Sequence, residues 1–188
     1  MEPHESVEES NDDPFKTRCA LLISVLALAL AISGLGGSNA GKDAAMSNIL
    51  AANAYNFYQA KNVRQTAYKI AADDLEAELK RGKLEPEHGA FLEKKLADYK
   101  KTIARYESEP ETKEGKKELM ATAKAHEAAR DTAMKKDPWF DYAGALLQIG
   151  IVLASVAIIT LRKSLFAAAG VLGIVGIAFT ANGFLLVF

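Results

Sequence analysis

Three polar residues spaced seven apart, Asp141, Gln148 and Ser155, have the types and spacing that point most directly to chemistry in this sequence. A spacing of seven places residues on nearly one side of a helix, with a drift of about 20° per heptad. A carboxamide in such a row can join two helices by hydrogen bonds, line a water-filled pathway below a carboxylate, or contact a small molecule or a lipid. The residue types are compatible with all three roles.

The motifs of known enzyme classes do not occur in the sequence. His4, His88 and His126 stand apart, and the HExxH-like pattern that begins at His126 has Arg130 in place of its second histidine. No phosphate-binding glycine loop, GxSxG or CxxC is found, and the single cysteine excludes a disulfide scaffold. We therefore expect a non-enzymatic protein without catalytic residues, cofactor or metal.

The charged residues are segregated along the chain, although the formal net charge is only -1. Three stretches lack Asp, Glu, Lys and Arg: 19–41, 142–161 and 164–188. Each is long enough to cross a hydrocarbon layer of ~30 Å, which needs about 20 apolar residues. The sequence thus predicts an all-α integral membrane protein with an N-terminal transmembrane helix and a C-terminal transmembrane hairpin. The predicted spans are 16–41, 138–161 and 164–188.

The flanking residues predict the orientation of these spans. Lys and Arg in short loops favour the cytoplasmic side, so Lys16, Arg18 and the 162–163 loop place the N-terminus and that loop in the cytoplasm. A cleaved signal peptide ending at Ser38-Asn39-Ala40 is the competing interpretation, but residues 1–15 are an acidic segment unlike a signal n-region. We expect a multi-pass protein of the bacterial inner (plasma) membrane, with 1–15 a disordered tail.

Residues 42–137 form a predicted charged helical insert, elongated, extramembrane and periplasmic. Basic and acidic side chains are nearly balanced in it, which argues against a nucleic-acid partner, and Ala, Glu, Lys and Leu favour helix. Breaks at Arg81-Gly82 and Ser108-Glu109-Pro110 predict three helices, from about 43 to 80, from near 86, and from after 110 to 136. Asp137-Pro138 predicts the start of a new helix. The apolar row of the middle helix predicts packing within one chain or between chains: Leu92, Leu96, Tyr99, Ile103 and Tyr106.

Two spans carry rows of small residues at alternating steps of three and four. In lipid, such rows mark helix faces where two backbones approach closely, within a subunit or between subunits. The row of the first span comprises Ala20, Ser24, Ala27, Ala31, Gly34 and Ser38. The row of the third span comprises Ala169, Gly173, Gly176, Thr180 and Gly183.

The segment AANAYNFYQAKNVRQTAYKIAADDLEA, which follows the first span, resembles the corresponding segment of a bacterial membrane-protein family described as domain of unknown function 4337. The run LLQIGIVLASVAIIT in the second span is also similar to that family. The resemblance covers most of the chain from about residue 15 and is carried by Tyr58-Gln59-Ala60-Lys61 and Leu147-Gln148. It implies an inner-membrane protein with this order of spans and no particular reaction. Tyr58, Gln59 and Lys61 are therefore residues to test.

These observations favour a homo-oligomeric inner-membrane protein that acts as a scaffold or as an accessory subunit of a membrane complex. Its expected partners are the lipid bilayer, further copies of itself and another membrane protein complex. The alternative is an oligomeric cation channel whose pathway is lined by Asp141, Gln148 and Ser155 on the second span.

Overall fold

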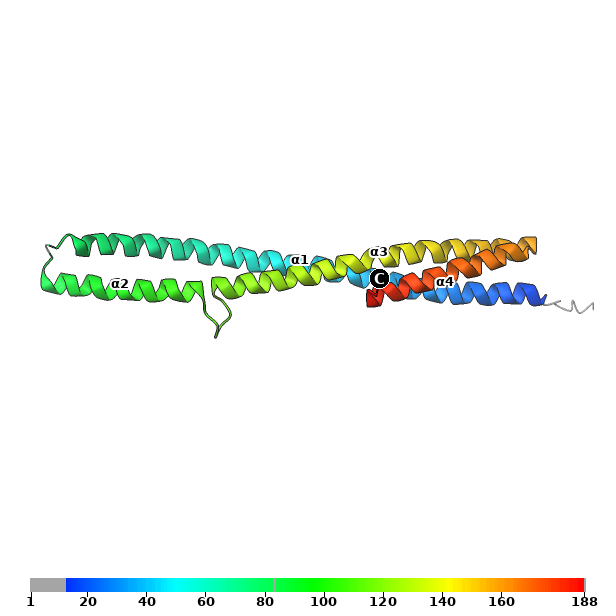
Figure 1. Cartoon of the computed structure of the whole chain (residues 1–188), viewed down its shortest axis with the longest axis horizontal. Helices are drawn as coiled ribbons and strands as arrows, with labels where there is room; N and C mark the ends of the chain where they lie inside the picture. Colours follow the sequence, from blue (N-terminus) through cyan, green and yellow to red (C-terminus); the bar gives the residue numbers. More distant parts are fainter. Residues whose placement is uncertain (1–12, 83, 188) are drawn as a thin grey trace, which may run out of the picture. The chain divides into compact units, whose positions relative to one another are not determined.

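The structure, a computed structural model, describes residues 13–82 and 84–187. In this range it contains four helices and no strand (Figure 1). The helices are α1 (Pro14–Lys80), α2 (Pro86–Glu107), α3 (Lys116–Thr160) and α4 (Lys163–Leu185). The prediction of an all-helical chain is therefore confirmed for the described residues. Most of the predicted acidic tail, residues 1–12, lies outside them.

Contacts divide the chain into two units, each of which contains part of α1 and part of α3. Unit 1 comprises Met1–Lys42 and Thr132–Phe188, and unit 2 comprises Asp43–Asp131. In unit 1 the helices are the first part of α1, the second part of α3, and α4. In unit 2 they are the second part of α1, α2, and the first part of α3.

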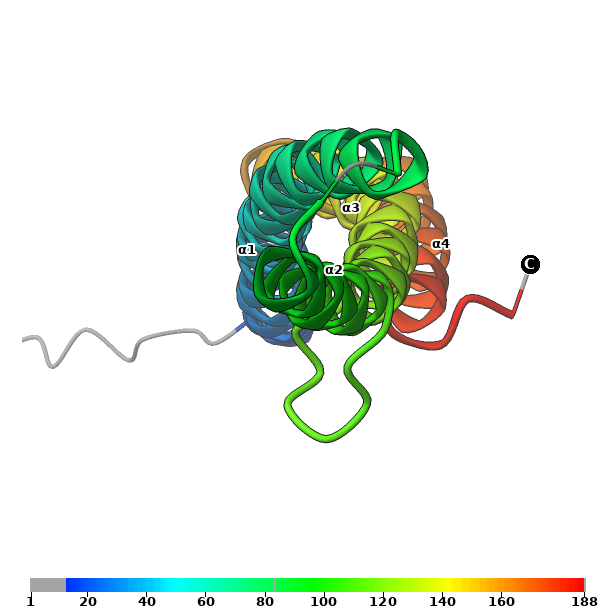
Figure 2. The same cartoon turned by 90° about the vertical axis from the view of Figure 1, so that its left-hand side faces the viewer.

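The turn that separates α1 from α2 lies where the sequence predicts it. α1 ends at Lys80, and Gly82 follows with a φ of +69°, a left-handed conformation that glycine adopts without steric cost. α2 then begins with Pro86 in its first turn, where the missing N–H of proline costs no helical hydrogen bond. The chain reverses at this turn, so in unit 2 α2 lies beside the second part of α1 (Figures 1 and 2).

The predicted apolar row of α2 faces α1. Leu92 is buried, and Tyr99 and Tyr106 contact the ring of Tyr68 on α1 at centroid distances of 5.2 and 5.9 Å. The first part of α3 continues along α1 beyond the end of α2, where Tyr55 donates a hydrogen bond to Glu127 at 3.1 Å. Unit 2 is thus a pair of antiparallel helical layers, one of which is interrupted by the loop 108–115.

In unit 1, large apolar side chains insert between glycines of neighbouring helices. Leu26 of α1 is 1% exposed, and its methyl groups lie close to Gly150 of α3 and at the position where a side chain of Gly173 on α4 would begin. A Cβ on Gly150 would lie 3.1 Å from Leu26 Cδ1, and a Cβ on Gly173 would collide with Cδ2. Close approach of the three helices therefore depends on these two glycines.

Phe140 of α3 forms a second such layer. Its ring fills the space beside Gly36 of α1 and Gly183 of α4, and a Cβ on Gly183 would lie 2.8 Å from the ring. The buried hydroxyl of Ser33 donates a hydrogen bond to the backbone carbonyl of Phe140 at 3.1 Å. The ring also contacts Phe184 edge to face at a centroid distance of 4.9 Å. These contacts join α1, α3 and α4 at one level.

Two predicted helix boundaries differ from the structure. α1 continues from the first predicted span into the insert without a break at Asp43. No proline interrupts this stretch, and Ala40 near the junction is buried. α3 passes through Pro138, where a new helix was predicted. A proline inside a helix removes one backbone hydrogen bond, but here the adjacent Phe140 is held by its packing in unit 1.

Three helices of the described chain are long and apolar enough to cross a membrane: α1, α3 and α4. In α1 and α3 the apolar segment is only part of the helix. α1 has 67 residues, whereas about 20 suffice to cross a hydrocarbon layer of ~30 Å.

Candidate functional site

The predicted polar row of the second span lies on the outer side of α3. Asp141, Gln148 and Ser155 are all exposed, whereas Ala143, Leu147 and Ala154 between them are fully buried. The row therefore does not face α1 or α4 in unit 1. The Ser155 hydroxyl donates a hydrogen bond to the carbonyl of Ile151 at 2.9 Å, within its own helix.

Of the three residues in this row, Gln148 has the strongest requirement for hydrogen-bond partners. Within the described part of the chain, its carboxamide makes no hydrogen bond to another residue. Its exposed neighbours on α3 are apolar, with Ile149 51% and Val152 59% exposed. A carboxamide surrounded by hydrocarbon would cost several kcal/mol without a partner, so its partner would have to come from outside this chain.

The two rows of small residues have different roles. All five members of the α4 row are buried, and this row accepts Leu26, Phe140 and Leu147 of the neighbouring helices. All six members of the α1 row are exposed, and a Cβ on Gly34 would meet nothing within 4 Å. The α4 row thus serves packing within the chain, while the α1 row is left exposed by the described residues.

A second group of polar residues surrounds the loop 108–115 in unit 2. It includes Tyr58 and Lys61, two of the residues on which the family resemblance depends. Lys61 Nζ lies 3.4 Å from Glu114 and 3.9 Å from Glu109, and 5.6 Å from the ring centroid of Tyr106. Gln59, by contrast, is exposed on the other side of α1. The motif residues are therefore divided between an inner and an outer face.

At the centre of this group, Gln65 of α1 spans the interruption between α2 and α3. Its side chain is 1% exposed and donates hydrogen bonds to the carbonyl of Ile103 at 3.0 Å and to Glu107 at 2.8 Å. The buried Lys116 donates to Gln65 at 2.9 Å and to Glu107 at 3.3 Å, and its ammonium lies 5.5 Å from the centroid of Tyr58. One carboxamide thus holds the end of α2 and the start of α3 on α1.

The start of α3 also holds the loop itself. Glu118 accepts a hydrogen bond from the Ser108 hydroxyl at 2.5 Å and from the backbone N–H of Glu109 at 3.1 Å. Gly115 is buried beneath these groups, and a Cβ there would collide with Glu118 and with the backbone of Glu109. The loop projects from the helices of unit 2 but is fixed at its base (Figure 2).

Hydrogen bonds in this group shift the acidities of two carboxyl groups. The pKa of Glu107 lies below its ordinary value because Gln65, and then Lys116, donates hydrogen bonds to the carboxylate. The pKa of Glu118 is lowered by the Ser108 hydroxyl and then by the Glu109 N–H. The lowered pKa values mean that these hydrogen bonds favour the ionised form of both carboxyl groups.

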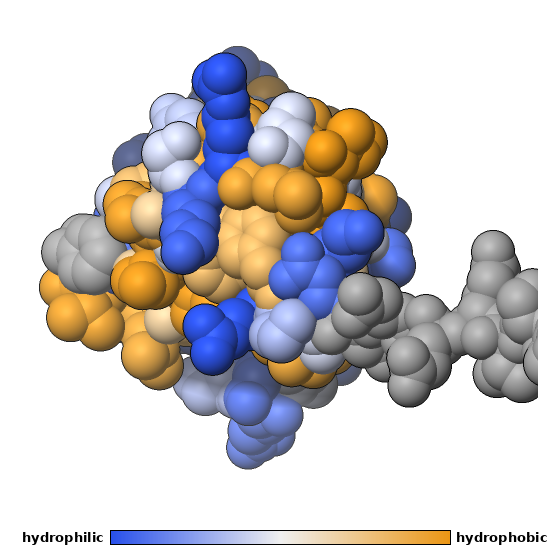
Figure 3. All heavy atoms as spheres, turned by 90° about the vertical axis from the view of Figure 1, so that its right-hand side faces the viewer, coloured by the Kyte–Doolittle hydropathy of each residue, from blue (hydrophilic) through white to orange (hydrophobic). Residues whose placement is uncertain are grey.

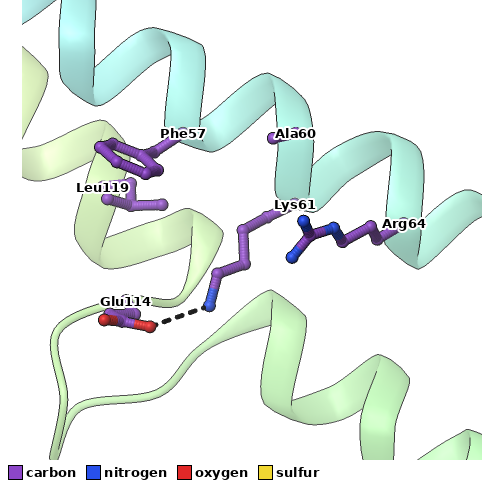
Figure 4. A pocket seen from close by; sticks show the side chains of 6 residues that line it. All are labelled: Phe57, Ala60, Lys61, Arg64, Glu114 and Leu119. Atoms are coloured by element: carbon purple, nitrogen blue, oxygen red, sulfur yellow. Dashed lines mark hydrogen bonds and ion pairs between the residues drawn. The ribbon is translucent and has the colours of Figure 1, made fainter.

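A shallow pocket of about 400 Å³ opens beside this group (Figure 4). In the close-up, the Lys61 side chain extends from α1 toward Glu114, while Phe57 and Leu119 face each other at the far side. Phe57, Ala60 and Arg64 complete the α1 side of its lining. The charged residues of its lining are Lys61, Arg64 and Glu114, and Lys61 is paired with Glu114.

Sequence reasoning did not identify Gln65, Lys116 or Gly115. A signal for Gln65 exists, since the buried face of α1 in unit 2 repeats every seven residues through Ala51, Tyr58, Gln65 and Ala72. A polar residue in an apolar heptad row indicates a buried hydrogen-bonding group. Lys116 carries no such signal, because it resembles the many solvated lysines around it. In residues 13–82 and 84–187, no group of three His, Cys, Asp or Glu side chains is placed to hold a metal ion.

Comparison with known proteins identifies one family. The family model described as a domain of unknown function (DUF4337) matches residues 15–186. At a significant level, neither curated proteins nor solved structures match the chain. The match covers both units, including the polar row of α3 and the group around loop 108–115.

Proposed function

Because the chain belongs to the DUF4337 family, whose description states no function, we propose its function from the geometry of the chain itself. We infer that it is a non-enzymatic membrane protein that forms homo-oligomers through the helices of unit 1. In this role it would act as a scaffold or as an accessory subunit of a membrane complex. The observation that carries this proposal is the carboxamide of Gln148, which is exposed on an apolar helix surface and has no hydrogen-bond partner among the described residues.

Membrane embedding is supported by the surface of unit 1. Its helices are largely apolar toward one another and also on their outer sides, where Leu28 is 64%, Ile159 82% and Ile174 71% exposed. Apolar residues around the whole circumference are typical of a helix bundle whose solvent is lipid. The proposed location is the bacterial inner membrane, with the N-terminus and the 162–163 loop cytoplasmic and residues 42–137 periplasmic.

Self-association is supported by two features that this chain leaves unused. In lipid, helices associate through close packing of small residues and through interhelical hydrogen bonds. The exposed α1 row, from Ala20 to Ser38, offers the first, and Gln148 offers the second. A second copy of the same chain supplies both, because each copy carries the same row and the same carboxamide.

The test compares the association of the wild-type chain with that of Gln148→Leu in detergent, as a function of dilution. We expect Gln148→Leu to weaken association severalfold, since an interhelical hydrogen bond in a membrane contributes about 0.6–2 kcal/mol. Ile174→Leu, which changes an exposed apolar residue of α4, is the control and should leave association unchanged. Equal association of all three proteins would contradict the proposed role of Gln148.

An oligomeric cation channel is the second candidate function, favoured because Asp141, Gln148 and Ser155 share the exposed side of α3. Measurement of ion flux into liposomes separates the two functions. A channel predicts flux that falls in Asp141→Asn, because the variant lacks the carboxylate at the mouth of the pathway. An intact oligomer without flux leaves the scaffold function.

A further inference from the structure

The ends of helices in unit 1 form a basic cavity that the proposed function does not use. α1 begins at Pro14, and the turn between α3 and α4 lies beside it, because the rings of Phe15 and Phe166 meet at a centroid distance of 5.8 Å. An open surface cavity of about 420 Å³ lies here. It is lined by Asp13, Pro14, Phe15, Arg18, Leu161 and Lys163.

Among the described residues, the basic side chains near this cavity outnumber the acidic ones. Lys16, Arg18, Arg162 and Lys163 are all exposed, and among the described residues none of the four takes part in an ion pair. The one carboxylate in the lining, Asp13, accepts the backbone N–H of Phe15 at 2.9 Å. Figure 3 views this end of unit 1 and shows hydrophilic side chains standing among apolar ones.

The position of the cavity along the helices favours the headgroup of an anionic lipid as its ligand. The charge-free stretches of α1, α3 and α4 begin or end directly beside it, at Cys19, Leu161 and Ser164. If unit 1 is embedded as proposed, this end lies at the level of the lipid headgroups, where basic pockets between helices bind anionic headgroups. Phe15 and Leu161 add an apolar wall suited to the first carbons beyond a phosphate ester.

We propose that this cavity binds the phosphate of an anionic phospholipid, with Arg18 and Lys163 as the direct contacts. The proposal rests on the embedding of unit 1 that the proposed function includes, but not on self-association. Arg18 offers several N–H donors in a fixed plane and suits a phosphate, while Lys163 contributes a point charge from the start of α4. Lys16 and Arg162 raise the local positive potential.

Native mass spectrometry of the full chain in mild detergent tests the proposal, because one spectrum reports both bound lipid and oligomer mass. We expect phosphatidylglycerol to bind at least tenfold more tightly than phosphatidylcholine. The double variant Arg18→Gln/Lys163→Gln should lose roughly tenfold or more of this affinity, given the contribution of each basic residue near an anionic surface. A monomeric mass with phosphatidylglycerol still bound would refute self-association and support this site.

The matched control is Lys135→Gln/Lys136→Gln. This double variant removes the same charge from two residues of α3 that do not line the cavity. It should leave phosphatidylglycerol binding within twofold of the wild type. Equal losses in the two double variants, or no preference for phosphatidylglycerol, would overturn the proposal. A second arm adds soluble glycerol 3-phosphate as competitor. Displacement of the lipid at equal concentration would assign the cavity to a soluble phosphate ester and overturn the lipid source.

Discussion

At the residue scale, two glutamines with the same functional group occupy opposite environments. Gln65 is buried and uses its carboxamide to hold the end of α2, Glu107 and Lys116 together on α1. Gln148 is exposed and has no such partner within the described chain. The first carboxamide therefore stabilises the fold, whereas the second is available for contacts that the single chain does not supply.

The carboxylate of Glu118 makes the base of loop 108–115 sensitive to pH. Since its pKa in the folded chain is lowered by the Ser108 hydroxyl and the Glu109 N–H, ionised Glu118 stabilises the loop at pH values above that of an unfolded glutamate, ~4.3. This stabilisation is lost as the pH falls through the lowered value. We expect hydrogen exchange of residues 108–119, corrected for intrinsic rates, to accelerate at low pH.

Glu118→Gln separates this effect from general acid unfolding. The glutamine amide has one acceptor oxygen and no charge, so it can accept the hydrogen bond of the Ser108 hydroxyl but cannot replace both hydrogen bonds of the carboxylate. The variant should therefore exchange faster at neutral pH and change less on acidification. Glu93→Gln, at an exposed position of α2, is the control and should follow the wild type. An exchange profile of Glu118→Gln identical to that of the wild type would refute the role of this carboxylate.

At the element scale, the sequence predicts where the helices break better than which faces they use. Gly82, Pro86 and the Ser108-Glu109-Pro110 segment mark breaks because their backbone requirements are local. Pro138 misleads, because tertiary packing of Phe140 keeps α3 continuous. The rows of small residues on α1 and α4 have the same spacing, and only three-dimensional packing distinguishes the occupied row from the unoccupied one.

A matched pair of substitutions tests this distinction between the two rows. Ala169→Leu enlarges a fully buried residue of the α4 row, so we expect it to destabilise unit 1 by about 1–3 kcal/mol and to lower the thermal midpoint measured by circular dichroism. Ala31→Leu makes the same change in the exposed α1 row. Measured at a dilution where the chain is monomeric, its midpoint should equal that of the wild type, whereas its association in detergent should be weaker.

The result for the Ala31→Leu variant decides the assignment of the α1 row. Loss of thermal stability as large as that of Ala169→Leu would mean that the α1 row packs within the chain. Unchanged association would mean that a second copy does not use this face.

At the scale of the whole molecule, the near-zero net charge is the sum of very different segments. Unit 1 contains the charge-free stretches, and unit 2 contains most of the charged residues of α1, α2 and α3. This segregation is visible in the sequence and predicts a membrane protein with a polar insert. The hydrogen-bonded group around Gln65 was not predictable, because it joins residues of α1, α2 and α3 that lie up to 51 positions apart.

The central claim, that the chain self-associates through its membrane helices, is tested most directly by the mass of the purified protein in mild detergent, corrected for bound detergent. We expect a mass of at least two chains of 20.3 kDa. On dilution, we also expect the Gln148→Leu oligomer to dissociate first. The wild-type oligomer should dissociate only at a lower protein concentration. A mass of one chain at every concentration would contradict the account.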